Sequence, residues 1–410
     1  MKKFFALLLS LAMVLALVAC GQKDPTPDTP DTPDDPQTKV EYKVAMITDY
    51  GDITDQSFNQ TTYEACKAFA EDNSIEFSYF KPAGDNTADR VAMIEKAVND
   101  GFNVIVMPGY AFGGAIVEAA PEFPDVKFIA LDVAAGDLLE TAVAKAGEAY
   151  DYTPENWDLN KYVDMSNVYC AVYQEELCGY MAGYAAVKLG YKNLGFLGGM
   201  SVPAVVRYGY GFVQGVDAAA ADLGLTDVKL NYIYGGQFFG DADITAVMDT
   251  WYQGGTEVVF ACGGGIYTSA VDAAKKVNAK VIGVDVDQAG VIAKYAGVDG
   301  MTVTSAMKGL YPATYDTLTD VIVNGNWDKY VGKIATLGLV SGTDPEANYV
   351  QIPMGDGTQW SDSFTQDDYK AMVKDMFDGK ITVSNNTSSD VTAASFATVI
   401  TVDDQGSIKG

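Results

Sequence analysis

The sequence predicts an α/β protein of two doubly wound, parallel-sheet lobes. Short apolar strands alternate with amphipathic helices from about residue 40 onward, and the strands are apolar at successive positions rather than at every second one. Such strands are buried on both faces, which is typical of a parallel sheet covered by helices on both sides. The alternation stops once and restarts, and a chain of 410 residues is long for one small domain, so two similar units in tandem are predicted.

The N-terminal segment, residues 1–19, is predicted to be a lipoprotein signal peptide. Lys2 and Lys3 precede the apolar run FFALLLSLAMVLALVA, which leads directly into Cys20. Small residues before a cysteine at the end of such a run are the lipobox pattern, in which the cysteine carries lipid after cleavage. A lipidated Cys20 implies a protein that is anchored through membrane lipid to the extracytoplasmic face of the cell membrane and does not span it.

Residues 20–39 are predicted to be the lipidated cysteine and a disordered tether. Pro recurs every two or three positions among Asp and Thr, and a segment of this composition cannot bury enough apolar surface to fold. The folded part is therefore expected to begin near Val40.

The first βα series, 40–172, predicts an N-terminal lobe. KVAMIT is an apolar strand, FNQTTYEACKAFAEDN has apolar positions at helical spacing, and TADRVAMIEKAVNDG is a helix with a Thr cap and a Gly stop. Further strands are predicted at 75–80, 103–109, 126–133 and 167–173. An acidic and aromatic connection, 134–166, interrupts the alternation.

The second series, 173–303, predicts a C-terminal lobe. Its strands are predicted at 194–199, 228–234, 257–265, 280–288 and 301–308, with helices at 174–190, 206–223, 241–253, 267–277 and 288–296. Later segments are expected to cross between the lobes, so that about 304–335 joins the N-terminal lobe and about 336–410, with a helix at 364–378, joins the C-terminal lobe.

The composition excludes several classes of function. Without Lys2 and Lys3, 25 of the 27 basic residues remain against 55 acids, a net charge of −30 that argues against nucleic acid as a partner. There is no His, which removes the commonest general base and metal ligand, and no cofactor or metal is expected.

The cysteines after the lipobox are interpreted as small apolar residues inside elements. None of them has CxxC spacing, so zinc and redox motifs are not indicated. A bridge within one pair, Cys170–Cys178, stays open as an alternative. The four residues are Cys66, Cys170, Cys178 and Cys262.

Polar residues and glycines directly follow several predicted strands. Asp49 opens the stretch DYGDITDQSFNQ after the first strand, and Asp285 and Lys308 end later ones. Ligands of open parallel sheets bind beyond the carboxyl ends of the strands, so we expect a site there. Two carboxylates and one ammonium suit a neutral, hydroxyl-rich ligand and would repel a phosphate. Other strand-end residues are Gly109, Tyr110, Asp132, Asp287 and Gly263–Gly265.

Aromatic residues near these strand ends suggest a flat ligand. Phe58 opens a helix and Phe239 lies in the glycine-flanked loop GGQFFGDAD, so rings from opposite lobes could enclose a base. Stacking of this kind contributes ~1–3 kcal/mol per base. Asn59 offers a donor and an acceptor for a base edge. Arg207 and Tyr208 begin a helix behind another glycine-rich strand end.

Each of these residues also has a structural interpretation. An Asp after a strand commonly caps a turn, and a Phe in the first turn of a helix commonly packs as a staple. Asp52 and Asp55 are interpreted in this way, as residues that shape and cap the turn before the first helix.

The motifs together resemble those of the BMP (basic membrane protein) family of bacterial lipoproteins. TDYGDITDQSFNQ resembles the family's opening motif, and RYGYGFVQG, VVFACGGGIY, VIGVDVDQ and VTSAMK follow in order, within a resemblance that covers about 42–383. The resemblance implies a purine-nucleoside-binding protein of an ABC transporter, a permease as partner, and a monomer. It also implies a type I periplasmic-binding-protein fold with three crossovers, and no enzymatic activity.

The resemblance also implies roles for individual residues. Family members often carry Glu where this chain has Gly209, which puts selectivity in question, and the connection 134–166 is longer than usual. Phe238 is the neighbouring alternative to Phe239 for stacking. The implied ligand residues are Phe58 and Phe239 around the base, Asp49 and Asn59 at its edge, and Asp285, Lys308 and Gly264 at the ribose.

Other interpretations stay open. Gly209 motivates a sugar or another small polar ligand. Clustered Asp49, Asp52 and Asp55 would suit Ca²⁺ in a nucleoside hydrolase, although the absence of His argues against it. A structural or sensory lipoprotein is the third alternative.

Overall fold

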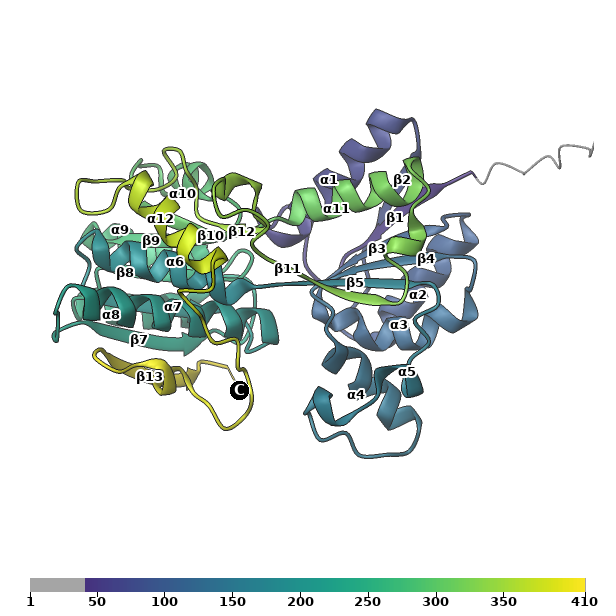
Figure 1. Cartoon of the computed structure of the whole chain (residues 1–410), viewed down its shortest axis with the longest axis horizontal. Coiled ribbons are helices and arrows are strands. Elements are labelled where there is room, and N and C mark those ends of the chain that lie inside the picture. Colours follow the sequence, from purple (N-terminus) through teal and green to yellow (C-terminus); the bar gives the residue numbers. More distant parts are fainter. Residues whose placement is uncertain (1–40, 410) are drawn as a thin grey trace, which may run out of the picture. The chain divides into compact units, whose positions relative to one another are not determined.

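Two sheets with mostly parallel strands organise the computed structural model, which describes residues 41–409 (Figure 1). The predicted signal peptide, Cys20 and tether lie outside the described residues. In spatial order, the first sheet consists of β11 (Lys333–Leu337), β5 (Val168–Tyr173), β4 (Lys127–Leu131), β3 (Val104–Pro108), β1 (Lys43–Ile47) and β2 (Glu76–Phe80), all parallel.

Helices pack around this sheet and form with it the first lobe. The helices are α1 (Phe58–Asn73), α2 (Thr87–Asn99), α3 (Gly113–Ala119), α4 (Ala135–Lys145), the one-turn α5 (Leu159–Tyr162) and α11 (Leu310–Leu318), which continues as a π-helical turn at Thr319–Val323. Figure 1 shows α11 beside α1, with which it is in contact. Strand β3 is buried at every position, as expected of a strand covered on both faces.

The second sheet, with its own helices, forms the second lobe. In spatial order its strands are β12 (Val350–Gln351), β10 (Thr302–Lys308), β9 (Lys280–Asp285), β8 (Val258–Cys262), β6 (Asn193–Gly198), β7 (Lys229–Tyr234) and β13 (Thr401–Ser407); only the β12–β10 pair is antiparallel. The helices are α6 (Glu175–Lys188), α7 (Pro203–Asp222), α8 (Ala242–Gln253), α9 (Tyr267–Val277), α10 (Ala289–Ala296) and α12 (Gln366–Phe377).

The chain passes between the sheets three times. It leaves the first sheet after β5, returns from β10 to β11, and leaves again from β11 to β12. Because β10 stays in the second sheet through Lys308, the second passage begins after this residue and not near 304. The α/β class with two parallel-dominated sheets is confirmed.

Two segments differ from the sequence prediction. The connection 134–166 contains helix α4, whose first turn is capped by the Asp137 carboxylate, which accepts the Ala134 N–H at 2.7 Å. The alternation of strand and helix therefore continues through it. Strand β13 was not predicted, because its sequence TVDDQGS is polar and mostly exposed at the sheet edge.

The four described cysteines are all free and buried, as the sequence indicated, and the alternative Cys170–Cys178 bridge is wrong. Among the residues that the structure describes, no helix combines the length and the apolar character needed to cross a bilayer.

Candidate ligand-binding site

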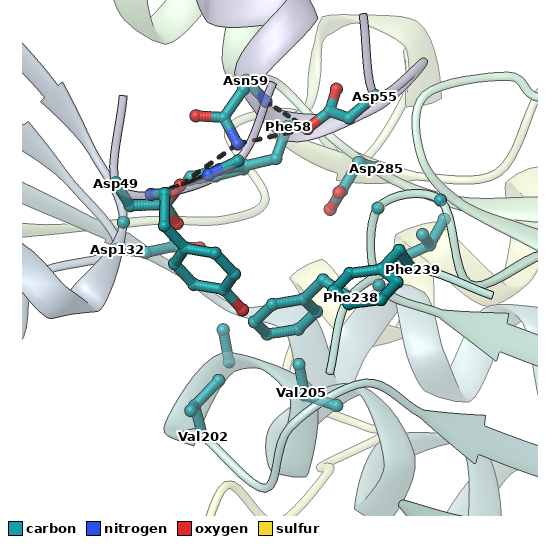
Figure 2. Close-up of a pocket in the computed structure, with 18 of the residues that line it drawn as sticks. Asp49, Asp55, Phe58, Asn59, Asp132, Val202, Val205, Phe238, Phe239 and Asp285 are labelled. Atoms are coloured by element: carbon teal, nitrogen blue, oxygen red, sulfur yellow. Dashed lines mark hydrogen bonds between the residues drawn. The ribbon is translucent and has the colours of Figure 1, made fainter. Parts of the chain in front are cut away.

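A cavity of about 410 Å³ lies at the carboxyl ends of strands from both lobes (Figure 2). Its volume is within the range of small-molecule pockets. Side chains at the carboxyl ends of strands in both sheets therefore meet at this cavity, as expected for ligand sites of open parallel sheets. The predicted residues that line the cavity are Asp49, Phe58, Asn59, Gly109, Tyr110, Tyr208, Phe239, Gly264, Asp285 and Lys308.

Asp49 and Asn59 form one wall. Oδ1 of Asp49 accepts the N–H groups of Tyr50 and Gly51, both at 2.7 Å, and burial raises the pKa of this carboxyl while these N–H groups oppose the rise. The Asn59 amide nitrogen donates to Asp49 at 3.4 Å and to Asp55 at 3.2 Å. Since both partners are acceptors, the amide orientation is fixed, and its buried Oδ1 has no hydrogen-bond partner.

The other acids of the loop before α1 have structural partners. Asp55 accepts the N–H groups of Ser57, Asn59 and Gln60 at 2.9, 2.9 and 3.1 Å, and so caps the first turn of the helix. Asp52 accepts from the Thr54 N–H at 3.1 Å and pairs with Lys81 at 3.0 Å. Both residues therefore shape the turn, as expected.

A buried cluster of charges surrounds Lys308. Its ammonium lies 2.5 Å from Asp132 Oδ2, 3.5 Å from Glu175 Oε1 and 3.8 Å from Asp285 Oδ1. Burial alone would lower the pKa of Lys308, but the charges of Asp132, Asp285 and Glu175 raise it above its ordinary value, so the side chain stays cationic.

Arg207 is the one predicted ligand residue that does not line the cavity, and the strand-end residue Asp287 does not line it either. The Nε of Arg207 donates to Oε2 of Glu175 at 2.6 Å, behind Lys308. Arg207 therefore acts on the site through the Glu175 carboxylate and is not placed to touch a ligand.

Asp285 ends β9 in the left-handed region, with φ of 64°. Its Oδ2 accepts the hydroxyl of Ser57 at 2.5 Å and its Oδ1 accepts the hydroxyl of Tyr208 at 3.2 Å. Burial raises the pKa of Asp285, and the Lys308 charge opposes that rise. Asp132, at the end of β4, shares the left-handed conformation with φ of 60°, and its Oδ1 is buried without a partner. Such backbone strain at two strand ends is typical of functional sites.

Aromatic rings lie on two sides of the cavity. Figure 2 shows Phe58 beside Asn59, and Phe238 and Phe239 together on the other side. The Lys308 ammonium lies 4.7 Å from the centroid of the Phe58 ring. Phe238 is half-buried, with its ring 6.4 Å from that of Tyr50, whereas 55 % of Phe239 is exposed. Both rings line the cavity, and Phe239 offers the larger exposed surface to a ligand.

Gly209 does not line the cavity, although the family resemblance had put ligand selectivity in question at this position. A Cβ at this position would lie 2.1 Å from the hydroxyl oxygen of Tyr232 and 2.8 Å from the Phe196 ring. The presence of Gly instead of Glu at position 209 therefore affects how α7 packs on its sheet and does not change the lining of the cavity.

Sequence reasoning missed some functional neighbours. Asp132 was predicted as a strand-end residue but not as a ligand residue. Its position directly after β4 was the signal that could have identified it. Tyr50 lines the cavity next to Asp49. Ser57 and Glu175 carry no motif; their roles depend on partners far away in the chain. Within 41–409, no group of three or more acidic, His or Cys side chains is arranged to hold a metal ion.

Comparison with known proteins gives a consistent family match. The family model described as ABC transporter substrate-binding protein PnrA-like, Bmp, matches residues 42–344. The ABC transporter nucleoside-binding protein BmpA of Lactococcus lactis subsp. cremoris is 25 % identical over 389 residues, 92 % of this chain and 96 % of the relative. An uncharacterised lipoprotein of Pyrococcus abyssi is 26 % identical over 320 residues, 74 % of this chain and 69 % of the relative.

Solved structures share the architecture. An ABC transporter solute-binding protein of Aeropyrum pernix superimposes with a TM-score of 0.63 at 18 % identity, covering 85 % of this chain and 95 % of that one. Together with the two sheets and three passages, this likeness confirms the type I periplasmic-binding-protein fold.

Proposed function

The chain belongs to the Bmp family of PnrA-like ABC transporter substrate-binding proteins, and we propose that it captures a purine nucleoside in the cavity between its lobes and delivers it to a membrane permease. The observation that carries the proposal is the pairing of Phe58 and Phe239 across a cavity that also contains the Asp285–Lys308 pair. The first pair suits a flat base, and the second suits the hydroxyls of a ribose.

The charges of the cavity favour a nucleoside over a nucleotide. Asp49, Asp132 and Asp285 are acids that line it. Its two lining cations already have carboxylate partners, Lys308 with Asp132 and Asp285, and Lys81 with Asp52. A phosphate would face uncompensated repulsion in this low-dielectric space. The name of the Lactococcus relative, a nucleoside-binding protein, supports the same ligand class.

Phe58 and Phe239 are proposed to hold the base, with Asp49 and Asn59 at its edge. The unpartnered Oδ1 of Asn59 offers a buried acceptor that a donor on the ligand would satisfy. Gly264, at φ of 47° in the loop after β8, is proposed to bring backbone close to the ribose.

Lipid on Cys20 is proposed to anchor the protein on the extracytoplasmic face, as a monomer that meets its permease there. The pattern before Cys20 supports this, as does the lipoprotein name of a relative. The role of this protein is proposed to be transport and not catalysis. The sugar alternative loses its motivation, because Gly209 lies outside the cavity lining.

The proposal is tested by the thermal stability of the mature protein with inosine, guanosine, adenosine, uridine, adenine, AMP and ribose. A ligand at ~100 times its Kd adds about 2.7 kcal/mol of stability, and we expect this rise with purine nucleosides only. Phe58→Ala should abolish it. Phe377→Ala is the control, because this ring is 49 % exposed on α12 and does not line the cavity.

Other outcomes decide between the alternatives. A rise with ribose or another sugar, and none with nucleosides, would establish the sugar interpretation. Release of free base from inosine, followed by chromatography, would establish a hydrolase. No stabilisation by any compound would favour a structural or sensory role.

A further inference from the structure

The segment 398–409 adds strand β13 to the edge of the second sheet. It pairs in parallel with β7, from Thr401 opposite Lys229 to Ser407 opposite Tyr234 (Figure 1). The family model ends at residue 344, so this strand lies beyond the part of the chain that it matches. Its polar sequence gives little apolar burial, which raises the question of what fixes it in place.

Asp217 on α7 fixes the start of the segment. One carboxylate oxygen accepts the N–H groups of Thr398, Val399 and Ile400 at 2.8, 2.8 and 3.2 Å, and the other accepts the Thr398 hydroxyl at 2.6 Å. Hydrogen bonds to a carboxylate are stronger than those between neutral groups. The strand therefore starts from a well-defined point.

The far end of the segment reaches the loop that carries the ligand-facing rings. The Lys409 ammonium forms an ion pair with Asp241 and donates to Oε1 of Gln237 at 2.9 Å. The Lys409 backbone also packs on Gly236, where a Cβ would lie 2.8 Å from the Lys409 carbonyl oxygen. The three partners belong to residues 235–241, which we call the aromatic loop.

The aromatic loop has few other restraints near Phe239. On the cavity side, the Gly265 N–H donates to the Phe238 carbonyl at 2.9 Å. On the outer side, Gln237 Nε2 donates to the Phe239 carbonyl and to Asp241, both at 2.9 Å. Since Phe239 is largely exposed, packing does not fix its ring. Its backbone is held by a β-bridge to Gly265 on the cavity side and by the polar contacts through Gln237 on the outer side.

We propose that residues 398–409 form a brace for the aromatic loop, and that Lys409 is a positioning residue for the ligand pocket. Lys409 holds Gln237 and Asp241 together, and Gln237 in turn holds the Phe239 backbone. The inference rests on the proposed function, because it takes Phe239 as a ligand contact. It adds a residue from outside the matched family region to the determinants of affinity.

The test compares Lys409→Ala with Lys276→Ala in the mature protein. Lys276 is a matched control, because it forms an ion pair with Asp249 at 2.7 Å in the same lobe but does not contact the aromatic loop. Two quantities are measured: amide hydrogen exchange of 235–241 without ligand, and the affinity for inosine by calorimetry. Lys409→Ala should speed exchange in this loop and weaken inosine binding about two- to five-fold, the range of a partly exposed ion pair. Lys409→Arg should restore both.

The outcomes separate this inference from the nucleoside proposal. Equal loop exchange in the two Ala variants overturns the brace. Faster exchange with unchanged inosine affinity overturns the positioning role of Lys409. If the unaltered protein binds no inosine, the nucleoside proposal fails, and the exchange comparison still decides whether Lys409 orders the loop.

Discussion

The hydroxyl of Ser57 donates to the carboxylate of Asp285 at 2.5 Å, across a separation of 228 residues in the chain. Ser57 precedes α1 of the first lobe, and Asp285 ends β9 of the second. A second hydrogen bond between the lobes lies close by in the sequence: Gln288 Nε2 donates to the Gln56 carbonyl at 3.1 Å. The lobes are thus joined by hydrogen bonds at the cavity itself, and a ligand that favours this arrangement would be retained by it.

Ser57→Ala should release bound nucleoside faster. A hydrogen bond to a charged group contributes about 1.5–3 kcal/mol, so we expect dissociation to accelerate ten-fold or more while association changes less. Stopped-flow displacement measures both rates. Thr365→Ala is the control, because its hydroxyl donates to the Asp368 carboxylate at 2.7 Å within a single lobe and does not line the cavity. Equal dissociation rates for the two variants would show that the contact between lobes does not retain ligand.

Lys308→Met should strongly destabilise the protein even without ligand. The change leaves Asp132, Glu175 and Asp285 with less compensation for their buried charge, and removing one partner of a buried ion pair costs about 3–5 kcal/mol. Urea unfolding measures the loss. The control is Lys96→Met, whose pair with Asp100 lies exposed on α2 and should contribute little. If Lys308→Met lowers the free energy of unfolding only slightly, water must reach the buried carboxylates around Lys308.

The strand-end residues were predictable from the sequence because the parallel sheet itself places them. Asp49, Gly109 and Asp285 each follow an apolar strand, and residues at the carboxyl ends of parallel strands share one edge. The same rule identified Asp132 only as a strand-end residue, since its pairing with Lys308 depends on how the two lobes meet. The pairing of Arg207, a possible ligand residue by sequence, could not be predicted for a similar reason, because its partner Glu175 lies on another helix.

Other features lacked a local signal or were outweighed by a stronger one. β13 is polar and exposed, so no hydrophobic pattern marks it, and its position depends on Asp217. Helix α4 did carry a signal in the spacing of Leu138, Leu139 and Ala142, which are buried on one face. The acidic and aromatic stretch that follows it obscured this spacing.

Glu176→Gln should stabilise the protein, and increasingly so as pH rises. Glu176 is buried with Oε2 unpartnered, and burial, with a contribution from Glu175, raises its pKa from 4.5 to about 7. Stability linked to this group is therefore full below pH 4.5 and falls as pH rises through about 7, because only the unfolded chain releases the proton in that window. The shift corresponds to about 3 kcal/mol.

Urea unfolding at intervals from pH 4.5 to 8 measures this effect as a difference between variant and unaltered protein. Taking the difference cancels the titration of the other carboxylates. Glu118→Gln, at an exposed position on α3, should give a difference that does not change with pH. A flat difference for Glu176→Gln as well would mean that the buried carboxyl finds a partner when it ionises.

Gly109→Ala should weaken ligand binding through Asp49. Gly109 follows β3 with φ of 126°, and a Cβ there would lie 3.0 Å from Oδ2 of Asp49, which cannot move freely because two backbone N–H groups hold its other oxygen. Gly101→Ala is a matched control, since φ is 93° there and a Cβ would meet nothing within 4 Å. Both variants should lose about 1 kcal/mol or more of stability from backbone strain. Only Gly109→Ala should also lower nucleoside affinity, by about ten-fold, equivalent to about 1.4 kcal/mol. Calorimetry on both variants separates the two effects, and equal affinities would remove Asp49 from the ligand contacts.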